Sequence, residues 1–167
     1  MYQVGSVVRH PSAGVCRIEG IEQRHFGNLP PINYYVLRPL YVTAATTVYT
    51  PVDSDKVPLR KLLQQEDMEE ILRQVPRQWM EWNDNEQARH QEFSAILHGD
   101  DTVQLIRLIV LLHRKLDERM AQGKRLRASD GRYLDEAKRL LHQEVAYAME
   151  MEPDQVADYI MEQLGKK

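Results

Sequence analysis

The amino-acid sequence predicts an α+β protein in which a β-rich segment comes first and an all-helical segment follows. Two observations favour this division of the 167 residues. Six of the eight prolines and four of the eight glycines lie in residues 1–60, together with most runs of Val, Ile, Tyr and Thr. From residue 62 onward, apolar residues recur at spacings of three and four, which is typical of amphipathic helices. We therefore expect two domains, residues 1–60 and residues 61–167.

The first segment contains four runs that read as β-strands. They cover residues 4–9, 14–23, 33–40 and 46–52, and turn residues such as those at 10–14 and 27–31 bound them. Short strands at this spacing favour a small antiparallel barrel. Within the second run, Arg17 and Glu19 share one face and Cys16 and Ile18 the other. We expect Cys16 in the core; a reactive thiol is the less favoured alternative, because no partner base is evident.

The second segment predicts five helices, near residues 66–75, 83–97, 102–122, 130–149 and 154–164. The third helix is apolar almost all round between residues 105 and 112, so we expect it at the centre of a helical bundle. The helix ends are marked by capping and breaking residues. Pro76 stops the first helix, Gly99-Asp100-Asp101 separates the second from the third, Gly123 ends the third, Ser129 or Asp130 caps the fourth, and Pro153 and Gly165 bracket the fifth.

No motif in the sequence argues for an enzyme. The six histidines include no HExxH pair, and no Cys/His set has zinc-ligand spacing. Phosphate-binding glycine motifs and a GxSxG nucleophile elbow are also missing from the sequence. Paired carboxylates such as those at 66–67, 69–70 and 100–101 stand at helix starts, where the helix dipole favours them. We expect no catalytic site, no metal and no cofactor.

The sequence also bears on location. The most apolar stretch, residues 105–112, is interrupted by Arg107 and is far shorter than the roughly 20 residues that span a bilayer. The first residues lack the basic and apolar regions of a signal peptide, and the single cysteine cannot form an internal disulfide. We expect a cytoplasmic protein without a membrane anchor.

The net charge of −3 conceals alternating blocks. Residues 1–60 carry +2, residues 61–103 carry −6, residues 104–142 carry +5 and residues 143–167 carry −4. In the basic block, Lys124, Arg125 and Arg127 crowd the connection between the third and fourth helices. These cations indicate a phosphate-contacting patch or, equally, a solvated surface whose positive charge is favourable near the C-terminus of a helix.

Two tryptophans, Trp79 and Trp82, stand between the first and second predicted helices. Three positions apart, they could share one helical face. The favoured interpretation is that both fill the seam between the short helix and the bundle. The functional alternative is an exposed indole that packs on a partner or wedges against a DNA base step.

Several segments together resemble a known family. They are residues 4–15 (VGSVVRHPSAGV), 18–22 (IEGIE), 34–40 (YYVLRPL) and 48–53 (VYTPVD). In this order they are similar to the RNA-polymerase-interacting module that CarD-type bacterial transcription regulators share with the transcription-repair coupling factor. The second half resembles the CarD helical domain in Trp82 and in residues 97–100 (LHGD), 123–126 (GKRL) and 135–141 (DEAKRLL).

This resemblance implies a Tudor/SH3-like antiparallel β-barrel that binds the β-subunit lobe of bacterial RNA polymerase, followed by an all-α bundle. The helical domain of the family contacts promoter DNA at the upstream edge of the melted bubble, without sequence specificity, and a tryptophan there supports the open complex. Such a regulator needs no active site, and we expect a monomer that associates with the nucleoid through the polymerase. The alternative is an interaction module that binds polymerase without direct DNA contact.

The resemblance also assigns residues. The polymerase-binding set is Arg24, Val48, Tyr49, Thr50 and Pro51, with Tyr49 standing where some relatives place a basic residue. The DNA-binding set is Trp82, Lys124, Arg125, Arg127, Arg132 and Lys138. Trp82 is the better match to the family's wedge because a polar helix follows it directly. The spacing of 17 residues from Trp82 to Gly99 is longer than in relatives, so Trp79 is the second choice.

Overall fold

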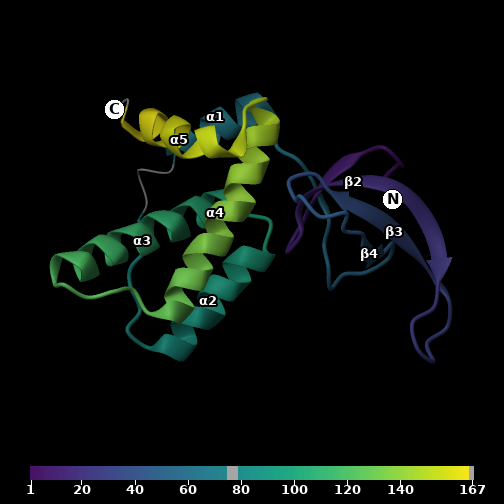
Figure 1. Ribbon diagram of the computed structural model, residues 1–167, viewed down its shortest axis with the longest axis horizontal. Helices are drawn as coiled ribbons and strands as arrows, with labels where there is room; N and C mark the ends of the chain where they lie inside the picture. Colours follow the sequence, from purple (N-terminus) through teal and green to yellow (C-terminus); the bar gives the residue numbers. More distant parts are fainter. Residues whose placement is uncertain (75–78, 166–167) are drawn as a thin grey trace. The chain divides into compact units, whose positions relative to one another are not determined.

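The computed structural model describes residues 1–74 and 79–165, and these form two compact units, Met1–Leu62 and Leu63–Lys167 (Figure 1). Two residues separate this division from the boundary that the sequence predicts. Val75 and Pro76, at the expected end of the first helix, lie outside the described residues.

The N-terminal unit is a five-stranded antiparallel sheet. Its strands are β1 (Val7–His10), β2 (Gly14–Arg24), β3 (Ile32–Pro39), β4 (Val48–Pro51) and β5 (Arg60–Lys61), in the spatial order β4-β3-β2-β1-β5. The four predicted strands are confirmed, whereas the sequence did not predict β5 because two residues carry no period. Within the described chain, β4 and β5 are the two edges, so the sheet is open and the expected closure into a Tudor-like barrel is not seen.

One face of the sheet forms a small hydrophobic core. Its fully or almost fully buried members are Val8, Cys16, Ile18, Tyr35 and Leu37. The expectation that Cys16 is a core residue is confirmed, since its exposed fraction is 0%. The N-terminus closes over the core, because the Tyr2 amide donates to the Tyr35 hydroxyl over 2.7 Å and the Tyr2 hydroxyl donates to the Leu59 carbonyl over 3.0 Å.

The turn between β1 and β2 depends on a histidine. Nδ1 of His10 accepts from the amides of Ser12, at 3.2 Å, and Ala13, at 2.9 Å. Gly14 follows at φ +78°, a conformation that favours glycine. Burial, followed by repulsion from Arg9, lowers the pKa of His10 below its usual 6.5. The ring is therefore a neutral acceptor that organises the turn.

Within its described residues, the C-terminal unit contains the five predicted α-helices. They are α1 (Gln65–Gln74), α2 (Glu86–His98), α3 (Thr102–Ala121), α4 (Ala128–Ala148) and α5 (Val156–Gly165), with a short 3-10 helix, η2 (Pro153–Gln155), before α5. Helix α4 packs on α1, α2, α3 and α5, whereas α3 packs on α1, α2 and α4 (Figure 1). The third helix was expected at the centre of the bundle, and α4 shares that position with it. The apolar stretch of α3 supplies much of the core, including Leu105, Ile106, Leu108 and Leu112.

The helix ends mostly follow the sequence signals. Asp101 caps α3 by accepting from the Gln104 amide over 3.2 Å. Gly123, at φ +68°, ends α3, and its amide and that of Lys124 donate to the Met120 and Arg119 carbonyls, over 3.0 and 2.8 Å.

Other predicted helix ends were wrong. Ser129 and Asp130 do not cap α4, since both lie in its first turn and Arg127 occupies the capping position without a side-chain bond. The Asp130 carboxylate has a stronger partner, the Arg89 guanidinium. Gly165 is the last residue of α5 and does not lie beyond it.

No helix within residues 1–74 and 79–165 combines the length and apolarity needed to cross a bilayer.

Candidate interaction surfaces

An arginine and a tyrosine meet at the β4 edge of the N-terminal sheet. The Arg24 guanidinium carbon lies 4.5 Å from the centre of the Tyr49 ring, and Nε of Arg24 donates to Glu22 over 2.7 Å. The Arg24 side chain keeps 44% of its surface exposed. The hydrogen bond to Glu22, the largest influence, raises the pKa of Arg24 further, so the guanidinium is a permanent, accessible cation.

Two more aromatic rings extend this contact. Phe26 lies 5.2 Å from Tyr34 and 6.2 Å from Tyr49, centre to centre. Phe26 is 47% exposed although it is fully apolar. We call Arg24, Phe26, Tyr34 and Tyr49 the edge patch. Phe26 and Tyr34 were missed in the sequence. Phe26 lies between an expected strand and an expected turn, and only the register of β2, β3 and β4 brings the rings together.

The other residues of β4 contribute differently. Thr50 is 2% exposed and Val48 packs on the hydrophobic core, so both side chains face inward. Of the predicted polymerase-binding set, the structure thus brings the side chains of Arg24 and Tyr49 together on one face. Val48 and Thr50 can offer a partner only the main chain of an edge strand, and Pro51 lacks an amide to donate.

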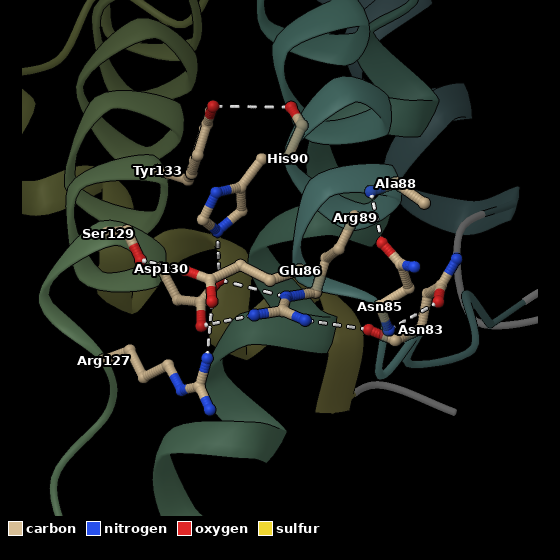
Figure 2. Close-up of polar contacts among 10 residues, drawn as sticks. All are labelled: Asn83, Asn85, Glu86, Ala88, Arg89, His90, Arg127, Ser129, Asp130 and Tyr133. Carbon is tan, nitrogen blue, oxygen red and sulfur yellow. Dashed lines mark hydrogen bonds and ion pairs between the residues drawn. The ribbon is translucent and has the colours of Figure 1, made fainter.

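In the helical unit, a buried ion pair joins the first turns of α2 and α4 (Figure 2). Nε and Nη2 of Arg89 donate to the two carboxylate oxygens of Asp130, each over 3.1 Å. Arg89 is 3% exposed and Asp130 is 1% exposed. Nε2 of His90 lies 3.0 Å from the same carboxylate, and Nη1 of Arg89 donates to the Asn83 carbonyl over 2.9 Å. The pair therefore has further partners that satisfy its polar atoms.

A second, exposed layer surrounds this pair (Figure 2). Nη1 of Arg127 donates to Glu86 over 2.6 Å, and the Ser129 hydroxyl donates to the same carboxylate over 3.4 Å. Asn85 caps α2 by accepting from the Ala88 amide over 2.9 Å. These contacts fasten the end of the basic connection to the start of α2.

The two tryptophans have unlike surroundings. Trp82 is half-buried, with the Arg89 guanidinium 4.4 Å from its ring centre, Lys115 Nζ at 4.8 Å and the Phe93 ring at 6.3 Å. Trp79 is 53% exposed and has the Arg114 guanidinium at 5.9 Å. Trp82 is thus held by residues of α2 and α3, whereas Trp79 presents more surface to a partner. That the two rings fill a seam against the short first helix stays a prediction.

The predicted DNA-binding cations fall into separate groups. Lys124 and Arg125 are exposed in the α3–α4 connection, next to Arg127, and Arg132 is exposed on α4. Lys138 lies eleven residues beyond Arg127, about 16 Å along the helix, half-buried among residues of α3 and α4. The structure therefore gathers Lys124, Arg125 and Arg127 but leaves Lys138 apart.

Within the described ranges, no three His, Cys, Asp or Glu side chains are grouped so as to hold a metal ion.

Comparison with known proteins identifies the first unit. Residues 2–63 match the family model described as the CarD-like/TRCF RID domain, an RNA-polymerase-interacting domain. The match spans almost the whole N-terminal unit, so the resemblance that the sequence motifs indicated is confirmed for this part of the chain. No curated protein matches the chain. The resemblance of the helical unit stays a prediction.

Proposed function

We propose that this chain, whose residues 2–63 are a CarD-like/TRCF RNA-polymerase-interacting domain, is a bacterial transcription regulator. It binds the β-subunit lobe of RNA polymerase through the N-terminal unit, as a monomer in the cytoplasm. Its helical unit contacts promoter DNA at the upstream edge of the bubble and stabilises the open complex. The match over residues 2–63 is the observation that carries the proposal.

The edge patch supports polymerase binding through β4. A four-residue edge strand offers main-chain groups to a strand of the partner, and this kind of pairing needs no particular side chain. The exposed cation of Arg24, seated on Tyr49, then supplies selectivity for an acidic or polar position on the partner.

Retention on an immobilised β-lobe fragment tests this interface. We expect Arg24→Glu to weaken retention of the full chain about tenfold, because the reversed charge faces the partner. Arg17→Glu is the matched control, since Arg17 is another exposed arginine of β2 outside the edge patch. Equal retention of the two variants would remove the edge patch from the interface.

The α3–α4 connection supports DNA contact. Lys124 and Arg125 are exposed and form no ion pair with any residue that the structure describes. Two or three such cations give weak, sequence-independent phosphate binding. That is sufficient when the polymerase holds the helical unit next to the promoter, because the effective concentration is then high.

An indole beside the bubble would favour the open state by binding it better than the closed one. Trp82 and Trp79 are both candidates, and their alanine variants separate them in an assay of open-complex lifetime. We expect the variant that removes the wedge to shorten the lifetime about tenfold, and an unchanged lifetime in both variants would reject a tryptophan wedge.

The charge pairing favours a second candidate, a module that binds polymerase without touching DNA. Three cations of the basic block are already partnered: Arg127 with Glu86, Lys115 with Glu118 and Arg139 with Glu136. Joint replacement of Lys124, Arg125 and Arg127 by Gln distinguishes the two functions. If these cations bind phosphates, the salt slope of promoter binding falls by about one for each phosphate released, whereas the second candidate predicts an unchanged slope.

A further inference from the structure

The helical unit has an apolar groove, and the proposed function gives this groove no role. It lies between α3, α4 and α5 and has a volume of about 640 Å³. Helix α3 lines it with Ile106, Ile109 and Val110, and α5 lines it with Ile160 and Met161. On both helices the lining positions recur at three- and four-residue spacing, so two apolar stripes border the groove.

The form of the groove suits a further helix. The α3 stripe continues from Ile106 to Asp117, which is about 16 Å, or three helical turns. Leu141 of α4 also lines the groove. An amphipathic helix with apolar residues at positions i, i+3, i+4 and i+7 would fill such a groove as a further member of the bundle.

The exposed residues have the composition of an interface. Met161 is 70% exposed and Trp79 is 53% exposed, and both line the groove beside Arg114. Trp, Met and Arg are the residue types that protein–protein interfaces favour. A methionine adapts its shape to the partner's side chains more easily than a branched residue does.

The charge of the rim selects the partner. Arg114 and Lys138 line the groove and form no ion pair within the part of the chain that the structure describes. Asp117 is the single carboxylate among the lining residues described. A floor of Ile and Leu offers nothing to phosphates, so a nucleic-acid backbone would leave the apolar part of the groove uncovered. A partner with acidic side chains beside apolar ones would pair with the cations at the rim and cover the apolar floor.

We propose that this α3–α5 groove binds an amphipathic helix of a partner protein, with acidic residues on the flank that faces Arg114 and Lys138. The inference does not rest on the proposed function. Lys138 was predicted from the family resemblance to bind DNA, and Trp79 is a candidate wedge. The decisive variant is therefore Met161→Glu, which alters neither.

The test uses the isotope-labelled full chain and a synthetic helical probe of about 15 residues, stapled to hold it helical. The probe carries Leu at i, i+3, i+4 and i+7 and Glu along one flank; a second peptide has Lys in place of each Glu. Affinity is measured from NMR shifts of the Trp79 indole and the Met161 methyl group. We expect the acidic peptide to bind about tenfold more tightly than the basic one.

Variants complete the test. Met161→Glu is expected to weaken the acidic peptide about tenfold, and joint replacement of Arg114 and Lys138 by Glu to reverse the preference between the peptides. The matched control is Met120→Glu, at an exposed methionine of α3 that does not line the groove, and it should bind like the original chain. Equal affinity for both peptides, no binding of either, or equal losses in the two methionine variants would overturn the proposal. So would self-association of the chain through this face, which would make a second copy the occupant.

Discussion

Each unit places an arginine over an aromatic ring, and the two pairs serve different purposes. In the N-terminal unit, Arg24 lies 4.5 Å from the Tyr49 ring and keeps 44% of its side chain exposed. In the helical unit, Arg89 lies 4.4 Å from the Trp82 ring but is only 3% exposed. The contact distance is nearly the same, whereas the access of solvent differs completely. A buried pair builds the fold, and an exposed pair is available to a partner.

The largest expected loss of stability comes from breaking the buried ion pair between Arg89 and Asp130. Arg89→Met leaves the Asp130 carboxylate buried without its main partner, so we expect the free energy of unfolding to fall by about 3–5 kcal/mol. Both tryptophans lie in the helical unit, and denaturant unfolding followed by their fluorescence therefore reports on that unit. Arg132→Met, at an exposed arginine on α4, is the control and should change little. A loss below about 1 kcal/mol in Arg89→Met would show that the pair is not structural.

The aromatic partner of Arg89 gives a smaller effect. Trp82→Ala removes a half-buried ring that contacts Arg89, Lys115 and Phe93, and we expect a loss of about 2 kcal/mol. Trp79→Ala removes an exposed ring and should leave stability nearly unchanged. The remaining tryptophan reports unfolding in each variant. Equal losses would contradict the different roles that the structure gives the two indoles.

The stability of the N-terminal unit depends on pH through the turn between β1 and β2. The pKa of His10 is lowered in the folded state, so the unfolded chain takes up a proton more readily than the folded one. The contribution of His10 is therefore present above pH 6.5 and is lost as the pH falls below that value. The protection of the Ser12 and Ala13 amides, which donate to His10, should fall on acidification once their exchange rates are compared with those of an unstructured chain at the same pH. Protection of these amides that does not respond to this titration would reject His10 as the acceptor.

The smallest expected effect on stability is at the exposed pair. Arg24→Met keeps most of the length of the side chain and removes its charge, and no loss of thermal stability is expected because surface pairs contribute little. Retention on the β-lobe should nevertheless decline. If Arg24→Met destabilises the N-terminal unit but leaves retention normal, Arg24 has a structural role and not the binding role that we assign to it.

The sequence predicted the strands and helices of both units better than it predicted the helix ends and the contacts between helices. Runs of Val, Ile, Tyr and Thr between turn residues located four strands, and the spacing of apolar residues located five helices. Ser129 and Asp130 were mistaken for caps, since an acid at a helix start has that appearance in a sequence. The true partner of Asp130 is Arg89, 41 positions earlier, and only packing of α2 on α4 reveals it.

The candidate sites show the same limit. Arg24 and Tyr49 were selected through family resemblance, but their contact depends on the register of three strands. Phe26 was missed because a single aromatic residue in a connection has no periodic signal. The separation of Lys138 from Lys124 and Arg125 was also invisible, since a count of charges along the chain does not say which helix face carries them.

The most direct test of the proposed function is a footprint of a promoter bound by purified polymerase, with and without this protein. We predict extra protection or extended melting at the upstream edge of the bubble. We also predict that Arg24→Glu abolishes this change and that Arg17→Glu does not. An identical footprint with and without the protein, or an effect that survives Arg24→Glu, would contradict the proposed function.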